Sequence, residues 1–131
     1  ESRSGGSPKA KKLIPMTPEQ NEVVVKGMWA VVNGGGTGAG IRIPDFEIAG
    51  KTGTAQVAEL GEDVGDKKDH AWVVSFAPAF KPEIAVIALI ENVGFGGSHA
   101  APAAKGVYDA YLAKRPGGPP ASADPNLVAE R

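Results

Sequence analysis

Apolar positions at helical spacing mark the first regular element of the chain. Val24, Met28 and Val31 lie four and three residues apart, which places them on one face of a helix. The preceding Thr17-Pro18-Glu19-Gln20 combines an N-cap hydroxyl, a proline at the first helical position and the glutamine of a capping box. The pattern predicts a helix from about Pro18 to Asn33, with its apolar face packed on a core.

Continuous apolar runs replace this periodicity further along the chain. Three stretches are interpreted as strands, at residues 46–58, 70–77 and 84–92. Pro78 and Pro82 bracket a short turn between the second and third stretches, which predicts an antiparallel hairpin. Because these two stretches are almost continuously apolar, we expect helices to cover both of their faces and Trp72 to pack in the core.

A second helix is expected after the strands. Pro102 suits its first turn, and Lys114 and Arg115 suit the negative end of the helix dipole. The apolar stripe of this helix consists of Val107, Tyr108, Tyr111 and Leu112. Between the first helix and the strands, the glycine-rich Gly34–Gly40 is interpreted as a mobile connector that leads into an extended Ile41–Pro44.

The order of these segments predicts the fold class and the domain organisation. We expect an α+β fold in which an antiparallel three-stranded meander has flanking helices, one before it and one after it. The folded unit covers residues 13–115, and residues 1–12 and 116–131 are expected to be flexible tails. A chain of 131 residues that begins with Glu1 is small for a complete two-lobed enzyme, so we expect a piece of a larger protein.

Composition excludes several classes of function. The chain has 14 basic and 15 acidic residues and a net charge of −1, without a basic stripe, which argues against nucleic acid as a partner. Cysteine is absent, so disulfides and thiolate metal sites do not apply. The longest apolar run, Ile84–Ile90, is too short to span a bilayer.

The candidate chemistry lies in the first predicted strand. Lys51, Thr52 and Thr54 stand there beside Gly50 and Gly53, where a core strand would carry apolar side chains. A buried lysine is costly unless it is paired, and a glycine weakens a strand unless another group must approach its backbone. The pattern therefore indicates an anion-binding strand edge.

A nucleotide-binding loop is the rival interpretation of Gly50-Lys51-Thr52. A Walker A loop needs glycine at position 45, where this chain has Asp45. The residues that follow Thr52 also predict a strand, whereas a phosphate-binding loop opens a helix. Both features argue against nucleotide binding.

The string from Ala49 to Val57 resembles the K-T-G element of the penicilloyl-serine transferases, above all that of class B, elongation-type penicillin-binding proteins. The resemblance extends over about residues 13–115 in the order of the elements. It implies the C-terminal portion of a β-lactamase/transpeptidase-like fold. The family's nucleophile motif S-x-x-K and its second motif S-x-N do not occur in this sequence; neither is begun by Ser2, Ser4, Ser7, Ser75, Ser98 or Ser122.

The resemblance implies a role for each residue of the motif. Lys51 would place positive charge beside the substrate carboxylate, and the hydroxyls of Thr52 and Thr54 would bind that carboxylate. The backbone N–H of Thr54 would be one of two oxyanion-hole donors. Gly53 would let the substrate backbone lie along the strand.

The resemblance also implies the partners of the site. The substrate would be a peptidoglycan stem peptide ending in D-Ala-D-Ala, and β-lactams would inhibit the complete domain. A serine-bearing remainder of the domain would supply the nucleophile, and the parent protein would be anchored at the periplasmic or extracytoplasmic face of the cell membrane. Neither a cofactor nor a metal is expected.

Strand geometry sets a condition on this site. With a side-chain period of two, Lys51 and Gly53 face one way and Thr52 and Thr54 face the other. One ligand can contact both sets only along the edge of the strand, so we predict that this edge has no neighbouring strand. His70, which begins the second strand, is a possible further contact.

Two other functions stay open at the level of sequence. The first is a related serine acyl-enzyme, namely a D,D-carboxypeptidase, a β-lactamase or a β-lactam sensor. The second is a non-catalytic module that keeps the fold and binds peptide termini.

Overall fold

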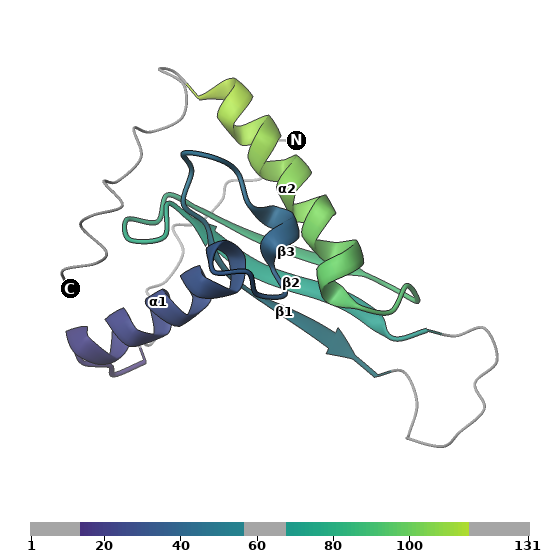
Figure 1. Ribbon diagram of the computed structural model, residues 1–131, viewed down its shortest axis with the longest axis horizontal. Helices are drawn as coiled ribbons and strands as arrows, with labels where there is room; N and C mark the ends of the chain where they lie inside the picture. Colours follow the sequence, from purple (N-terminus) through teal and green to yellow (C-terminus); the bar gives the residue numbers. More distant parts are fainter. Residues whose placement is uncertain (1–13, 57–67, 116–131) are drawn as a thin grey trace, which may run out of the picture.

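The computed structural model describes residues 14–56 and 68–115, which form one sheet and two main helices (Figure 1). The elements in chain order are α1 (Pro18–Asn33), the short 3-10 helix η1 (Ala39–Ile41), β1 (Ala49–Ala55), β2 (His70–Ala77), β3 (Ile84–Ile90) and α2 (Gly96–Lys114). The expected tails, residues 1–12 and 116–131, lie outside the described residues, as does the predicted end of the first strand at residues 57–58.

The three strands form a meander in the order β1-β2-β3, and both pairs are antiparallel. Gly50 of β1 lies opposite Ser75 of β2, and Ser75 lies opposite Val86 of β3. The predicted α+β class is therefore confirmed, with one helix before the meander and one after it. Because β2 is the middle strand, β1 and β3 are the edges of the described sheet.

Helix α1 has the predicted bounds and the predicted N-terminal signals. Thr17 and Gln20 form the capping box, each side chain accepting from the other residue's backbone N–H. At the other end, the Asn33 side-chain amide donates to the carbonyls of Trp29 (3.0 Å) and Ile48 (2.9 Å). This amide ties the end of α1 to the segment that enters β1.

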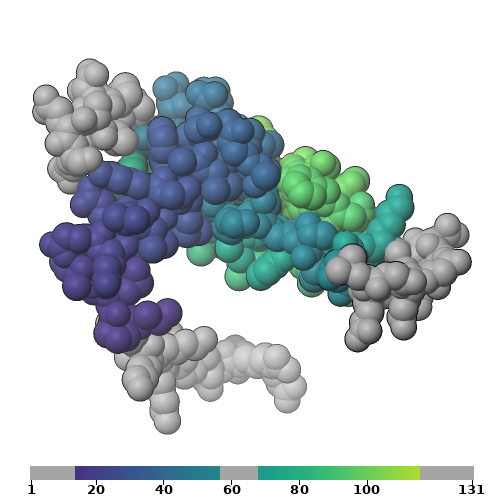
Figure 2. Space-filling model, turned by 60° about the horizontal axis from the view of Figure 1, so that its bottom comes forward, coloured from purple at the N-terminus to yellow at the C-terminus, as the bar shows by residue number. Residues whose placement is uncertain are grey.

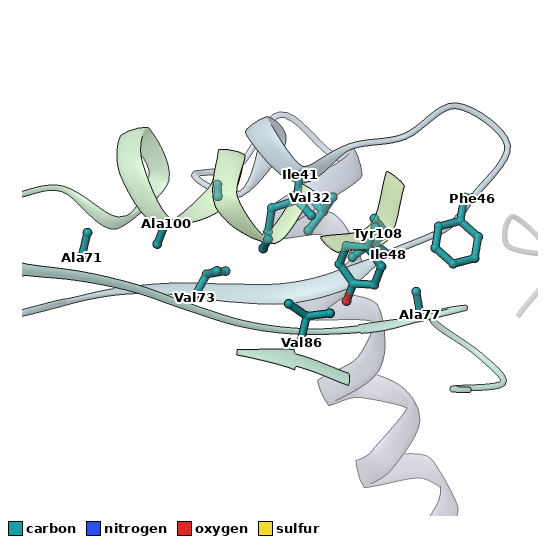
Figure 3. Packing of buried hydrophobic residues seen from close by; sticks show 12 residues of the cluster. Val32, Ile41, Phe46, Ile48, Ala71, Val73, Ala77, Val86, Ala100 and Tyr108 are labelled. Atoms are coloured by element: carbon teal, nitrogen blue, oxygen red, sulfur yellow. The ribbon is translucent and has the colours of Figure 1, made fainter. Parts of the chain in front are cut away.

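The core lies between α2 and one face of the sheet (Figure 3). Figure 3 shows Ala71, Val73 and Val86 of the sheet on the side of Ala100 and Tyr108. We call this side the inner face. Small alanines on α2 allow the helix to pack close to the strands, as expected for a tightly filled interior.

Tyr108 is the largest of the fully buried side chains. Its hydroxyl donates to Ser75 Oγ at 3.0 Å, and Ser75 Oγ donates to the carbonyl of Val86 at 3.3 Å. The ring packs against Phe46 with 5.9 Å between the centroids in an edge geometry. Burial raises the pKa of the Tyr108 phenol, and the hydrogen bond with Ser75 opposes part of that rise.

Both ends of α2 are fixed to the sheet. At its first turn, Gly96 is buried against the backbone carbonyls of Gly53 and Trp72, and an added Cβ would collide with both. At its last turn, the Tyr111 hydroxyl donates to Glu83 Oε2 at 3.2 Å, and Arg115 forms an ion pair with Glu83 at 3.0 Å. The helix therefore spans the sheet from the end of β1 to the turn between β2 and β3.

The second face of the sheet departs from expectation. Trp72, Ile87 and Leu89 are 42%, 73% and 58% exposed on the side away from α2, which we call the outer face. Helices were expected to cover both faces of β2 and β3, and that prediction is wrong for the described residues. The apolar pattern marks two faces suited to burial, but only the inner face finds its cover within the described part of the chain.

Several boundaries also differ from the sequence prediction, and the third strand ends at Ile90 instead of at residue 92. Helix α2 begins at Gly96, so Pro102 lies inside the helix instead of in its first turn. The close approach of Gly96 to the strands starts the helix earlier than the proline signal suggests. The expected extended Ile41–Pro44 is also wrong, because Ile41 ends η1 and is fully buried.

The first strand is shorter than predicted. Phe46 belongs to an isolated bridge with Ile43, and the intervening Asp45 has a positive φ of 60°. Phe46, which was expected to open the strand, closes this tight turn instead, and β1 starts at Ala49. Positive φ is unusual for a residue other than glycine, although aspartate is among the types that adopt it more often.

We predict that Tyr108→Phe lowers the stability of a domain containing this segment by about 1 kcal/mol at pH 7, because one buried hydrogen bond is lost. The folded-state pKa is raised, so the phenol contributes stability below its unfolded pKa of about 10 and loses it as pH rises through the folded value. The free energy of unfolding, measured in urea between pH 7 and pH 11, should therefore fall less steeply with pH for the variant. The control is Tyr111→Phe, which removes an exposed hydrogen bond; equal alkaline slopes for wild type and Tyr108→Phe would contradict the prediction.

Candidate functional site

The lysine strand is an edge strand of the described sheet. β1 pairs with β2 along its whole length, from Ala49 opposite Phe76 to Ala55 opposite His70. No other strand of the described residues lies on its second side. The prediction of a free edge beside Lys51 is confirmed for this part of the chain, and Figure 1 shows β1 as the outermost strand of the meander.

Lys51 is exposed and its ammonium lies against its own strand. Nζ donates to the backbone carbonyl of Thr52 at 2.6 Å. In an antiparallel pair, residues whose backbone groups face the partner strand alternate with residues whose groups face away. The bond from Lys51 indicates that the backbone of Thr52 faces the open edge, and the N–H of Thr54, two residues later, then faces the same way.

The register between β1 and β2 places the side chains of the motif on alternate faces of the sheet, as predicted. Lys51 and Gly53 lie opposite Val74 and Trp72 on the outer face. Thr52 lies opposite Val73 on the inner face, and Thr54 follows two positions further on that face. Charge and hydroxyl groups therefore reach the edge from opposite sides of the sheet.

The two threonines differ in their surroundings. Thr54 is exposed, whereas Thr52 is only 7% exposed. The Thr52 hydroxyl shares a hydrogen bond of 2.6 Å with the hydroxyl of Thr37, in the glycine-rich segment after α1. Of the two hydroxyls, that of Thr54 is the more accessible to a ligand, and the contact from Thr52 stays a prediction.

Trp72 covers Gly53 on the outer face. A Cβ built on Gly53 would collide with the indole nitrogen and two neighbouring ring carbons of Trp72. The expectation that Trp72 packs in the core is therefore wrong: the ring lies across the strand at the candidate site. Position 53 requires glycine for this close approach, which is a reason that the sequence alone did not supply.

The glycine-rich segment also contributes to the site, which sequence reasoning did not foresee. Gly38 is buried, and its N–H donates to the carbonyl of Val31 at 3.0 Å. The segment therefore follows the last turn of α1 and brings Thr37 to the lysine strand. A single threonine among glycines gave no signal of this contact in the sequence.

His70 lies at the same end of the sheet, one strand away from the edge. It pairs with Ala55, and its Nδ1 accepts a hydrogen bond from the backbone N–H of Asn92 at 3.1 Å. Asn92 has a positive φ of 57°, in the connection between β3 and α2. The imidazole thus holds this connection, and contact with a substrate stays a prediction.

The described residues contain no group of three or more histidine, cysteine or acidic side chains that could hold a metal ion. The arrangement offers instead an exposed ammonium, an exposed hydroxyl and a backbone N–H along one open strand edge. Groups of this kind suit a peptide that carries a carboxylate and lies alongside the strand.

The family model described as the penicillin binding protein transpeptidase domain matches residues 6–109. The chain belongs to this family. Its K-T-G residues, Lys51, Thr52 and Gly53, lie on the edge strand β1. The resemblance to a class B, elongation-type penicillin-binding protein is confirmed by its relatives.

Among these relatives is the peptidoglycan D,D-transpeptidase MrdA of Haemophilus influenzae, which is 42% identical over 104 residues. The MrdA of Acinetobacter baumannii is 48% identical over 88 residues. These matches cover 72% and 61% of this chain, but only 16% and 13% of the relatives. The chain thus spans about a sixth of the length of the curated relatives that it matches.

Solved structures resemble the fold at similar coverage. Pseudomonas aeruginosa PBP2, in complex with WCK 5153, is 39% identical with a TM-score of 0.63, over 76% of this chain and 20% of that protein. The transpeptidase domain of FtsI4 from Legionella pneumophila is 25% identical with a TM-score of 0.63, over 74% of this chain and 37% of that domain. No described helix is long and apolar enough to cross a membrane.

We predict that Gly53→Ala destabilises a domain containing this segment by about 1–3 kcal/mol, because the new methyl group displaces the indole of Trp72. In a Trp72→Ala background, the same change should cost much less. Urea unfolding measures both effects. The matched control is Gly106→Ala, at an open position of helix α2 where nothing lies within 4 Å and a gain of about 0.5–1 kcal/mol is expected. An equal gain from Gly53→Ala would refute the clash.

Proposed function

We propose that this chain supplies the carboxylate-binding and oxyanion side of a serine D,D-transpeptidase that cross-links peptidoglycan. The observation that carries the proposal is the open edge of β1 with exposed Lys51 and Thr54. The curated relatives are named peptidoglycan D,D-transpeptidases, which supports this reaction over a carboxypeptidase, a β-lactamase or a sensor.

The substrate of this reaction carries its own negative charge. A stem peptide that ends in D-Ala-D-Ala presents a free carboxylate next to the amide bond to be broken. Lys51 donates to a neutral carbonyl of its own strand, and exchange of that acceptor for a carboxylate converts a neutral acceptor into a charged one. The ammonium is charged with either acceptor, but a carboxylate adds a Coulombic attraction that the neutral carbonyl lacks.

The backbone of Thr54 would stabilise the oxyanion of the reaction, in addition to the binding of the carboxylate at the edge. Its N–H is the proposed donor to the oxygen that becomes negative when serine attacks the carbonyl. The second donor would be the amide of the nucleophile itself, which belongs to a different segment. A donor fixed in a strand needs no reorganisation during the reaction, which is the basis of oxyanion stabilisation.

The substrate peptide would lie beside β1 as an additional strand. The edge of β1 has the length for several backbone hydrogen bonds. Lys51 and Thr54 would flank the terminal carboxylate of the bound peptide. Added strands gain affinity from main-chain bonds and specificity from side-chain contacts. β-Lactams that carry a comparable carboxylate would occupy the same edge in the complete domain.

The serine-bearing remainder of the domain is the proposed partner of the outer face. Trp72, Ile87 and Leu89 expose a contiguous apolar surface there, larger than single scattered residues. The chain spans only 16% of the Haemophilus MrdA, so most of such a protein is available to cover these groups.

Helix α1 also lacks cover at its start. Val23 is 71% exposed, and Figure 2 shows the first turns of α1, in purple, projecting away from the rest of the described residues. The same serine-bearing remainder would pack on this helix. Such a protein would act at the periplasmic face of the membrane, where peptidoglycan is assembled.

We predict that Lys51→Ala reduces acylation of the complete transpeptidase domain by a fluorescent penicillin, on the order of 10²-fold in second-order rate constant, because the carboxylate loses its charged partner. The matched control is Lys105→Ala, which removes a lysine paired with Asp109 on the exposed side of α2 and should label as wild type. The 131-residue chain alone should not label, since it has no S-x-x-K serine. Full labelling of Lys51→Ala would end the proposal.

We predict that Leu89→Asp lowers the free energy of unfolding of the complete domain by more than about 2 kcal/mol, because the outer face is buried in that domain. The matched control is Val107→Asp, on the outward side of α2, which should cost less than about 1 kcal/mol. Chemical unfolding of the two variants gives the comparison. Equal, small effects would show that nothing covers the outer face.

A further inference from the structure

A hydroxyl pair links the glycine-rich segment to the lysine strand. Thr37 Oγ1 and Thr52 Oγ1 lie 2.6 Å apart, at the short end of the range for bonds between hydroxyl groups. Thr52 is only 7% exposed, whereas Thr37 lies at the surface. One hydroxyl of the pair must donate and the other must accept.

The direction of this bond decides what Thr52 can do at the strand edge. A threonine hydroxyl has one proton and two acceptor positions. When Thr37 donates, the Thr52 oxygen accepts and the Thr52 proton becomes available to a second acceptor. A carboxylate is an acceptor only, so an anion at the edge favours this direction of the pair.

Thr37 is itself held in place by two further contacts. The backbone N–H of the next residue, Gly38, donates to the carbonyl of Val31 at 3.0 Å. On the other side, the Thr37 carbonyl packs against Gly97, where an added Cβ would lie 2.5 Å from that oxygen. The residue is therefore fixed between the last turn of α1 and the first turn of α2.

We propose that Thr37 is a positioning residue that orients the Thr52 hydroxyl toward a carboxylate bound at the edge of β1. It acts through Thr52 and does not touch the ligand. The inference rests on the proposed function of the edge and adds a residue outside the K-T-G motif to it. It also accounts for a threonine in a segment otherwise made of glycines from Gly34 to Gly38.

The test is a double-mutant cycle in the complete transpeptidase domain, read as the second-order rate constant of acylation by a fluorescent penicillin. Thr37→Val removes the donor at nearly constant volume, and we expect a reduction of about five- to tenfold. Thr37→Ser keeps the hydroxyl and should restore the rate to within about twofold. In a Thr52→Val background, Thr37→Val should have no further effect, because the group that it orients is gone.

Two controls separate this proposal from the others. Thr17→Val destabilises α1 at its N-cap, far from the strand, so it reports what a loss of stability alone does to acylation; an equal reduction there would overturn the proposal. Lys51→Ala reports the function of the edge itself. If Lys51→Ala strongly reduces acylation while Thr37→Val leaves it unchanged, only the proposed role of Thr37 is wrong. If the effects of Thr37→Val and Thr52→Val on the acylation rate are independent, Thr37 does not act through Thr52.

Discussion

The one-sided pairing of β1 is the constraint on which the candidate site depends. β2 occupies one edge of this strand over its full length, and the described residues leave the other edge open. An unpaired strand edge is a hazard for most proteins because it invites association with other chains. Here the exposed Lys51 stands at that edge, where a charged side chain discourages unspecific pairing. In the proposed function, the same charge would select a peptide that carries a carboxylate.

Much of the fold followed from local signals in the sequence. The bounds of α1 and of β2 were predicted correctly because caps, glycines and prolines lie beside them in the chain. The start of α2 was not predicted correctly. It lies at Gly96 because this glycine contacts the carbonyls of Gly53 and Trp72, which are distant in sequence. The open outer face could not be foreseen either, since a hydrophobicity pattern shows that a surface is suited to burial but not which chain buries it.

The candidate site also contains residues that the sequence identified and residues that it did not. Lys51 and Thr54 could be identified from the motif, and the opposite orientation of neighbouring side chains followed from strand geometry. The positions of Trp72 over Gly53 and of Thr37 beside Thr52 could not, because they depend on the register between strands and on the path of the glycine segment. A family motif names the groups that meet the ligand, whereas the groups that hold them are found only in three dimensions.

The indole above Gly53 bears on which substitutions such a strand tolerates. Any side chain at this position must first displace a neighbouring ring, so a change there alters the packing of the strand. Thr54 and Ala55, by contrast, are exposed, and their replacement disturbs no packed neighbour. Substitutions on this strand therefore disturb its packing least at the last residues, beyond the glycine.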